Sequence, residues 1–202
     1  MVSTNKIPRI YKEMESRGFF NDKTYLRLDD MEWMSVKEIE DYEYEEGESC
    51  DIIPFAMTGG GDKWVWVTNK NNYIGICDHA DTVGEFYACS MEDAILRQIF
   101  EYVAGGDFYI DENESNPFQE SEEDLKNRLD EWRLRLSGIV KDEYLNIIDD
   151  LGKLHLKKLV QCRTEYYALL SSDELDELID RYIKFDLMDK EFEWCTEEYF
   201  KF

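Results

Sequence analysis

Three consecutive glycines, Gly59 to Gly61, follow a short apolar run and precede a segment rich in tryptophan and valine. Glycine tolerates positive φ, so this triplet can reverse the chain within a few residues. The residues from Trp64 to Thr68 are mostly β-branched or aromatic and predict a strand. A phosphate-binding loop would need a helix after the glycines and a hydroxyl residue after Lys63, and neither is present. The triplet therefore predicts a turn between two strands and argues against nucleotide binding.

Further strand and helix signals surround this turn. Strand composition continues over 51–57, 73–77 and 85–89, and the asparagine-rich stretch 69–72 predicts a hairpin turn between two of these strands. Such short connections favour antiparallel pairing. A first helix is predicted over 6–17, and Ser90 is expected to cap a longer apolar-striped helix that ends at Gly105.

The second half of the chain has helical periodicity after an acidic, polar linker at 111–120. Helices are predicted over 121–138, 144–152, 154–170 and 171–183, and the aromatic tail 192–202 is expected to dock on the body. We therefore predict three parts: an α/β domain over 1–110, the linker, and a helical region over 121–202 packed on or beside the first domain. The predicted fold class is α+β, with a mainly antiparallel, twisted sheet of about four to six strands flanked by helices.

Three segments of the first domain resemble the SUKH superfamily, which includes the yeast cell-wall synthesis regulator and many bacterial immunity proteins. Ile53–Val67 combines an apolar-Pro-Phe-Ala segment, a Gly-Gly-Gly-Asp turn and a tryptophan-bearing strand; Trp33–Ile39 resembles a helix start of that family; Phe86–Ile95 resembles its strand that turns directly into a helix. The resemblance covers about residues 25 to 104. It implies a non-catalytic α/β interaction domain, and many such domains inhibit toxins, nucleases among them.

The charge balance restricts the classes of partner. The chain has 23 basic and 47 acidic residues, a formal net charge of −24. Such a surface repels nucleic acids and anionic lipid and attracts basic proteins, although the charge could also serve solubility alone. No window approaches the roughly 18 apolar residues of a membrane span, and five scattered cysteines give no disulfide framework. We therefore expect a cytoplasmic chain with reduced thiols, without direct nucleic-acid or membrane binding.

Catalytic and metal-binding patterns are weak. The sequence Cys77-Asp78-His79 could pair a thiol with an imidazole, but neighbours two apart on a strand rarely meet productively. A zinc site from Cys50, Cys77, His79 and Cys89 lacks the spacing of common zinc modules, and buried cysteines are the simpler interpretation. A calcium loop would use Asp111, Asn113, Ser115 and Glu122, but its sixth position holds Asn116 and Pro117 follows. We expect no enzyme activity, no metal and no cofactor.

The candidate partner-binding residues are acidic or aromatic and lie near predicted strand ends. An acidic run with interspersed tyrosines is either a solvated face or a patch for a basic partner, and alternating tryptophans are either core or an exposed platform. The candidates are Glu38, Glu40, Asp41, Tyr42, Glu43, Tyr44, Asp62, Trp64, Trp66, Asp78, His79 and Asp81.

Three functional hypotheses follow from these observations. The first is a cytoplasmic immunity protein that neutralises a basic toxin, with nucleases as one class of target. The alternative is a regulatory scaffold that recruits a housekeeping protein. The third is an enzyme or metal protein that uses Cys77, His79 and nearby acids. A homo-oligomer is compatible with each of them.

Overall fold

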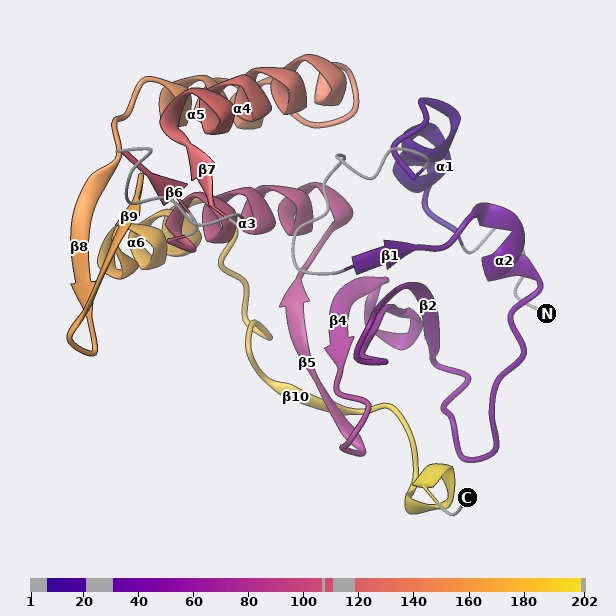
Figure 1. Cartoon of the computed structure of the whole chain (residues 1–202). Helices are drawn as coiled ribbons and strands as arrows, with labels where there is room; N and C mark the ends of the chain where they lie inside the picture. Colours follow the sequence, from indigo (N-terminus) through magenta and orange to yellow (C-terminus); the bar gives the residue numbers. More distant parts are fainter. Residues whose placement is uncertain (1–6, 21–30, 107, 111–118, 201–202) are drawn as a thin grey trace. The chain divides into compact units, whose positions relative to one another are not determined.

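The protein has an α+β fold, seen in a computed structural model that describes residues 7–20, 31–106, 108–110 and 119–200 (Figure 1). The chain divides into two compact units. Unit 1 comprises Met1–Ala94 and Ile183–Phe202, and unit 2 comprises Ile95–Tyr182. Unit 1 is therefore assembled from two stretches of chain that are separated in sequence by the whole of unit 2.

A six-stranded antiparallel sheet forms the centre of unit 1, in the order β1-β2-β3-β4-β5-β10. Its predicted antiparallel pairing is confirmed. The strands are β1 (Met31–Trp33), β2 (Ile52–Thr58), β3 (Lys63–Val67), β4 (Tyr73–Cys77), β5 (Val83–Ala88) and β10 (Glu191–Glu193), and two short helices accompany them, α1 (Arg9–Ser16) and α2 (Val36–Glu40).

Both predicted turns are present between the central strands. Gly61 has φ +98°, and the backbone N–H of Thr58 donates to the carbonyl of Asp62 at 2.9 Å, which closes the β2–β3 turn. Between β3 and β4 the chain forms a short 3₁₀ turn, η2 (Thr68–Lys70), followed by Asn71 and Asn72 at φ 55° and 59°. Glycine and asparagine tolerate this left-handed conformation, so local composition sets both turns.

The sheet of unit 1 is covered on both faces. All five residues of β3 are buried. On one face Trp66 stacks on Phe55, with ring centroids 4.6 Å apart, and contacts Tyr11 of α1 edge-on at 5.0 Å. On the other face a buried cluster unites residues of the strands with Trp194 and Cys195. The tryptophans of β3 therefore belong to the core, and the alternative of an exposed indole platform is wrong.

A C-terminal strap, residues 187–198, supplies the cover on this second face. Its central strand β10 pairs with β5, and the ring of Phe192 lies where Gly75 and Gly84 leave room for it: a Cβ at Gly75 would lie 2.5 Å from that ring. Trp194 is fully buried and its Nε1 donates to the carbonyl of Asp81 at 2.8 Å. The expected docking of the aromatic tail is confirmed for Phe192, Trp194 and Tyr199, whereas Phe200 is exposed. A short 3₁₀ helix, η4 (Glu197–Phe200), follows β10.

Unit 2 combines helices with a four-stranded mixed sheet in the order β7-β6-β9-β8. Helix α3 begins in unit 1, where Ser90 accepts a hydrogen bond from the backbone of Asp93 as predicted. None of the helices in the described ranges is long and apolar enough to cross a membrane. The elements are α3 (Met91–Ala104), β6 (Phe108–Tyr109), β7 (Glu120–Ser121), α4 (Glu122–Leu136), α5 (Asp142–Gly152), β8 (Lys157–Gln161), β9 (Thr164–Ala168) and α6 (Ser172–Tyr182).

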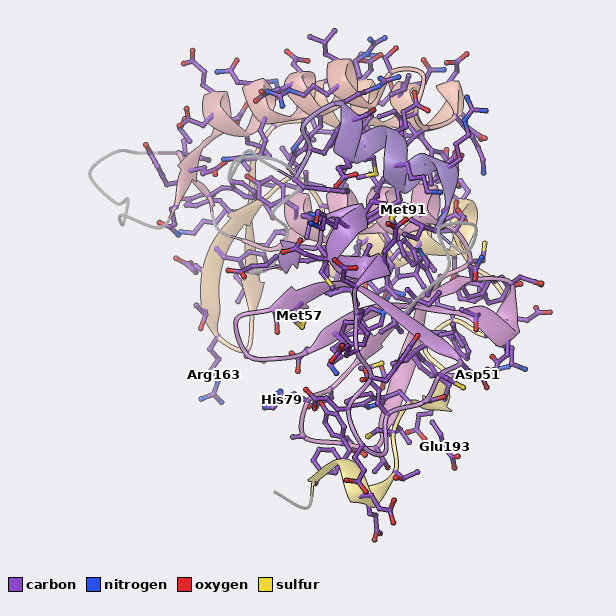
Figure 2. The ribbon with its side chains drawn as sticks, turned by 90° about the vertical axis from the view of Figure 1, so that its right-hand side faces the viewer. Asp51, Met57, His79, Met91, Arg163 and Glu193 are labelled. Carbon is purple, nitrogen blue, oxygen red and sulfur yellow. The ribbon has the colours of Figure 1, made fainter. Side chains whose placement is uncertain are left out.

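The helix predicted over 154–170 is wrong, because these residues form the β8–β9 hairpin. Cys162 and Arg163, at φ 49° and 70°, make its two-residue turn, and Figure 2 shows Arg163 projecting from the tip. Across the hairpin Leu159 pairs with Tyr166, so the apolar and aromatic residues that suggested a helix form cross-strand pairs instead. Helices α4, α5 and α6 match the other predicted helices.

Candidate functional site

A buried ion pair lies at the end of the unit 1 sheet where β3 begins. Lys63 is 5% exposed, and its Nζ donates to the Oε1 of Glu48 at 2.9 Å and to the hydroxyl of Tyr42 at 3.0 Å. The Glu48 side chain is fully buried and also accepts from the Tyr42 hydroxyl and from the backbone N–H of Glu45. A buried charge needs such a complete set of partners.

Aromatic rings enclose the Lys63 ammonium. The ring centroids of Tyr199, Trp194 and Tyr42 lie 5.0, 5.2 and 5.7 Å from its Nζ, distances at which a cation is attracted to a π face. Burial alone would lower the pKa of Lys63, but its hydrogen bonds to Tyr42 and Glu48 outweigh that effect and raise the pKa. Burial raises the pKa of Tyr42. The lysine therefore stays charged and the tyrosine neutral over the physiological range.

The two loops beside this ion pair are joined by Asp62 and His79. Asp62 lies in the β2–β3 turn, and its Oδ1 accepts from the backbone N–H of His79 at 3.0 Å and lies 2.7 Å from the imidazole Nδ1. The hydrogen bond from His79 lowers the pKa of Asp62, and the same bond raises the pKa of His79. The imidazole itself projects from the ribbon into solvent (Figure 2).

Asp62, Asp78 and His79 also form a group that could approach a metal ion, with ligand atoms within 4.8 Å of one another. A metal needs a neutral imidazole, whereas the carboxylate of Asp62 favours the protonated one. The contacts of Asp62 already join the two loops, so we assign this group to loop positioning. The cluster found among the described residues contains no cysteine, so the structure does not bring Cys50, Cys77 and Cys89 together with His79 in such a group.

Exposed and half-exposed carboxylates surround the buried ion pair on several loops. The residue 43–48 loop carries the Glu48 contacts, the turns 59–62 and 78–82 flank the start of β3, and the strap reaches the same place through a bridge between Glu48 and Cys195. We call this surface the acidic end. Within the described loops its cationic groups are the buried Lys63 and His79, and its carboxylates are Glu43, Glu45, Glu46, Asp62, Asp78, Asp81, Glu193, Glu197 and Glu198.

The predicted candidates divide into four groups. Glu43, Asp62, Asp78, His79 and Asp81 are brought together at the acidic end. Tyr42 and Tyr44 are half-buried and structural, since the Tyr44 hydroxyl donates to the carbonyl of Ile52 at 2.7 Å. Trp64 and Trp66 lie in the core.

The remaining candidates belong to the region of α2. Glu38 completes the capping box of this helix with Ser35, and the backbone hydrogen bond from Ser35 lowers the pKa of Glu38. Glu40 and Asp41 end α2. The predicted acidic run therefore splits, with its helical part serving local structure and its later part joining the acidic end.

Sequence reasoning missed the two residues that organise this surface, Glu48 and Lys63, and the carboxylates that the strap contributes. The bridge between Glu48 and Cys195 joins positions from opposite halves of the sequence, and no local pattern encodes it. The aromatic tail was the available signal, because buried Trp194 places Glu193 and Glu197 beside the same loops.

Comparisons with protein-family models, with curated proteins and with solved structures found no match to this chain. The resemblance to the SUKH superfamily therefore stays a prediction. The site has to be interpreted from its own geometry and charge.

Proposed function

We propose that this chain is a non-catalytic binding protein whose acidic end holds a basic partner protein. The observation that carries the proposal is the gathering of carboxylates from four separate loops around one fully paired, buried lysine. Fixed charge on loops beside a rigid sheet attracts an oppositely charged protein and orients it on approach.

The proposed partner is a toxin domain with a basic surface, such as a nuclease, which this chain would neutralise in the cytoplasm. This assignment follows the resemblance to immunity proteins and the net charge of −24. A nuclease needs a cationic surface to bind its substrate, so an acidic inhibitor can compete for that surface.

The test compares two variants that lose the same number of charges in different places. Glutamine replaces three carboxylates of the acidic end in one variant and three exposed carboxylates of unit 2 in the matched control. The acidic-end variant carries Glu43→Gln, Glu46→Gln and Glu197→Gln, and the control carries Glu123→Gln, Glu143→Gln and Glu177→Gln.

We expect the wild type to recover a basic protein from its native cells at low salt, and to lose it as the salt concentration rises. The acidic-end variant should associate with that protein roughly tenfold more slowly, while the control changes little. Co-expression of the recovered protein with the wild type should restore cell growth. Equal effects of the two variants, or salt-insensitive binding, would overturn the acidic end as the interface; a recovered protein without toxicity would overturn the immunity assignment and favour a regulatory scaffold.

A further inference from the structure

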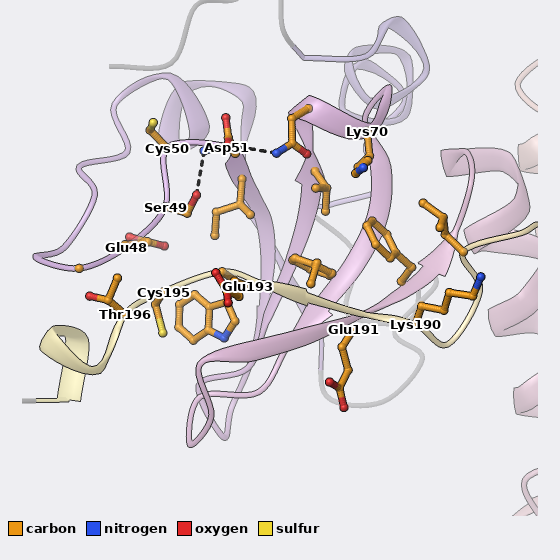
Figure 3. Close-up of a pocket in the computed structure, with 18 of the residues that line it drawn as sticks. Glu48, Ser49, Cys50, Asp51, Lys70, Lys190, Glu191, Glu193, Cys195 and Thr196 are labelled. Atoms are coloured by element: carbon orange, nitrogen blue, oxygen red, sulfur yellow. Dashed lines mark hydrogen bonds between the residues drawn. The ribbon is translucent and has the colours of Figure 1, made fainter.

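A hollow of about 870 Å³ opens along the strap of unit 1 (Figure 3). Ile52 of β2, Val67 of β3 and Phe86 of β5 lie beneath it in the sheet and are at most 3% exposed, so its accessible apolar surface comes mainly from the partly buried Leu187 and Phe192 of the strap. Its volume lies within the range of pockets that enclose a small molecule or a group of side chains, about 300–1,000 Å³.

The hollow exists because an extended strap covers this face of the sheet where a helix would fill it. A helix with its side chains is about 10 Å wide, whereas β10 is a single strand of three residues that pairs with β5 alone. Beyond β10 the strap crosses to Glu48 at the far side of the face. Phe192 and Leu187 remain only partly buried as a result.

The charges around the hollow are not evenly distributed. One end is formed by Gly47, Glu48 and Thr196, with Glu193 and Glu198 on the rim, and is continuous with the acidic end. Figure 3 shows Lys70 and Lys190 at the opposite end. Asp51 and Glu191 line the hollow as well, so this second end has mixed charge, whereas both lysines that line the hollow lie away from the acidic end. A bound segment would therefore lie in one direction, with its cation near Glu193 and Glu198.

We propose that the hollow receives an apolar side chain of the basic partner, carried on a segment whose neighbouring lysine or arginine faces Glu193 and Glu198. This inference rests on the proposed function and names the contact that would slow dissociation of the complex. Binding energy at interfaces concentrates in a few aromatic or long side chains that fill pockets, and the surrounding charges mainly guide association. The charges of the acidic end would speed association, and the hollow beside it would hold the side chain that contributes most of the affinity.

The test uses two defined peptides and two tryptophan variants of the full chain. The probes are a short peptide of alternating lysine and arginine with one central tryptophan, and the same peptide with alanine in the centre. Thr196→Trp fills the hollow from an exposed position on its wall, and Thr164→Trp places the same side chain on the exposed start of β9 in unit 2, where it does not line the hollow. Unchanged circular dichroism and melting temperature of each variant establish that it folds.

Calorimetry should show that the wild type binds the tryptophan peptide at least about tenfold more tightly than the alanine peptide. Thr196→Trp should abolish this difference, and Thr164→Trp should keep it. Equal affinities for the two peptides, or a difference that survives Thr196→Trp, would overturn the inference.

The two proposals fail in different ways. If both peptides bind equally and salt weakens both, the acidic end stands and the hollow has no part in binding. If neither peptide binds at low salt, both proposals fail. If sedimentation shows a wild-type dimer that Thr196→Trp dissociates, the occupant is a second copy of this chain and the inference is wrong.

Discussion

At the scale of single residues, Lys63 determines much of unit 1. It follows the glycine turn, begins β3 and joins Glu48 and Tyr42 beneath the rings of Trp194 and Tyr199. In the sequence, Lys63 follows the glycine turn directly, and its neighbours do not indicate that it is buried. The contacts that bury it come from residues 15 positions earlier and 131 positions later, which is why no local pattern could predict the pair.

Replacement of Lys63 by methionine should destabilise the protein strongly. The substitution leaves the Glu48 carboxylate buried without its cation, a change that typically costs about 3–5 kcal/mol. Adding Glu48→Gln should recover part of the loss, since the buried charge is then removed as well. Urea unfolding measures the free energy of unfolding of the single and the double variant. The matched control is Arg17→Met, which breaks the more exposed Arg17–Glu13 pair and should cost at most about 1 kcal/mol; equal losses for Lys63→Met and Arg17→Met would contradict the expectation.

At the scale of elements, the sequence predicted those whose signals are local. Asn71 and Asn72 turn the chain between β3 and β4, as expected from residue type, and the helix predicted from residue 121 begins there because Ser121 caps α4 through a capping box with Asp124. The sequence predicts a helix where the β8–β9 hairpin lies, because Cys162 and Arg163 are not residue types typical of a two-residue turn. Strand β10 escaped prediction because three residues carry too little periodicity, and only pairing with β5 makes them a strand.

The fit of β10 against its neighbours gives a prediction at this scale. Gly75→Ala would place a Cβ 2.5 Å from the ring of Phe192, so the ring has to move and the strap loosens. We expect a loss of about 1–3 kcal/mol in stability and faster hydrogen exchange at Glu191–Glu193. In the background Phe192→Ala the same glycine substitution should cost much less.

Gly60→Ala is the matched control, since its Cβ would meet nothing closer than 3.5 Å. It should leave the exchange rates of Glu191–Glu193 unchanged. An identical exchange profile for Gly75→Ala and Gly60→Ala would mean that the Phe192 ring does not hold the strap.

At the scale of the whole molecule, the net charge of −24 opposes folding in both units. The acidic end concentrates part of this repulsion on a few loops, where binding of a basic partner would relieve it. The same carboxylates would therefore favour binding of the partner and lower the stability of the free protein. The charge itself could be predicted from the sequence, but its gathering on one surface could not, because it depends on how the strap returns to the sheet.

Salt should therefore raise the melting temperature. Going from about 0.01 M to about 1 M sodium chloride shortens the screening length from about 30 Å to about 3 Å, and each kcal/mol of relieved repulsion is worth about 2–4 °C for a chain of this size. The variant with Glu43→Gln, Glu46→Gln and Glu197→Gln should melt higher than the wild type at low salt and respond less to added salt. A melting temperature that falls with salt, measured by calorimetry, would show that attractive pairs outweigh the repulsion.

The return of the strap also sets an order of events during synthesis. Residues up to 88 provide five strands of the sheet, yet one of its faces stays uncovered while all of unit 2 is translated, because Trp194 and Cys195 emerge about 100 residues later. On the ribosome, the nascent chain therefore exposes the apolar face of an incomplete sheet, which a chaperone could shield. Unit 1 is therefore completed late in synthesis. Until the strap pairs with the sheet, Glu48 and Lys63 lack the covering rings of Trp194 and Tyr199. The acidic end also lacks the carboxylates of the strap until then.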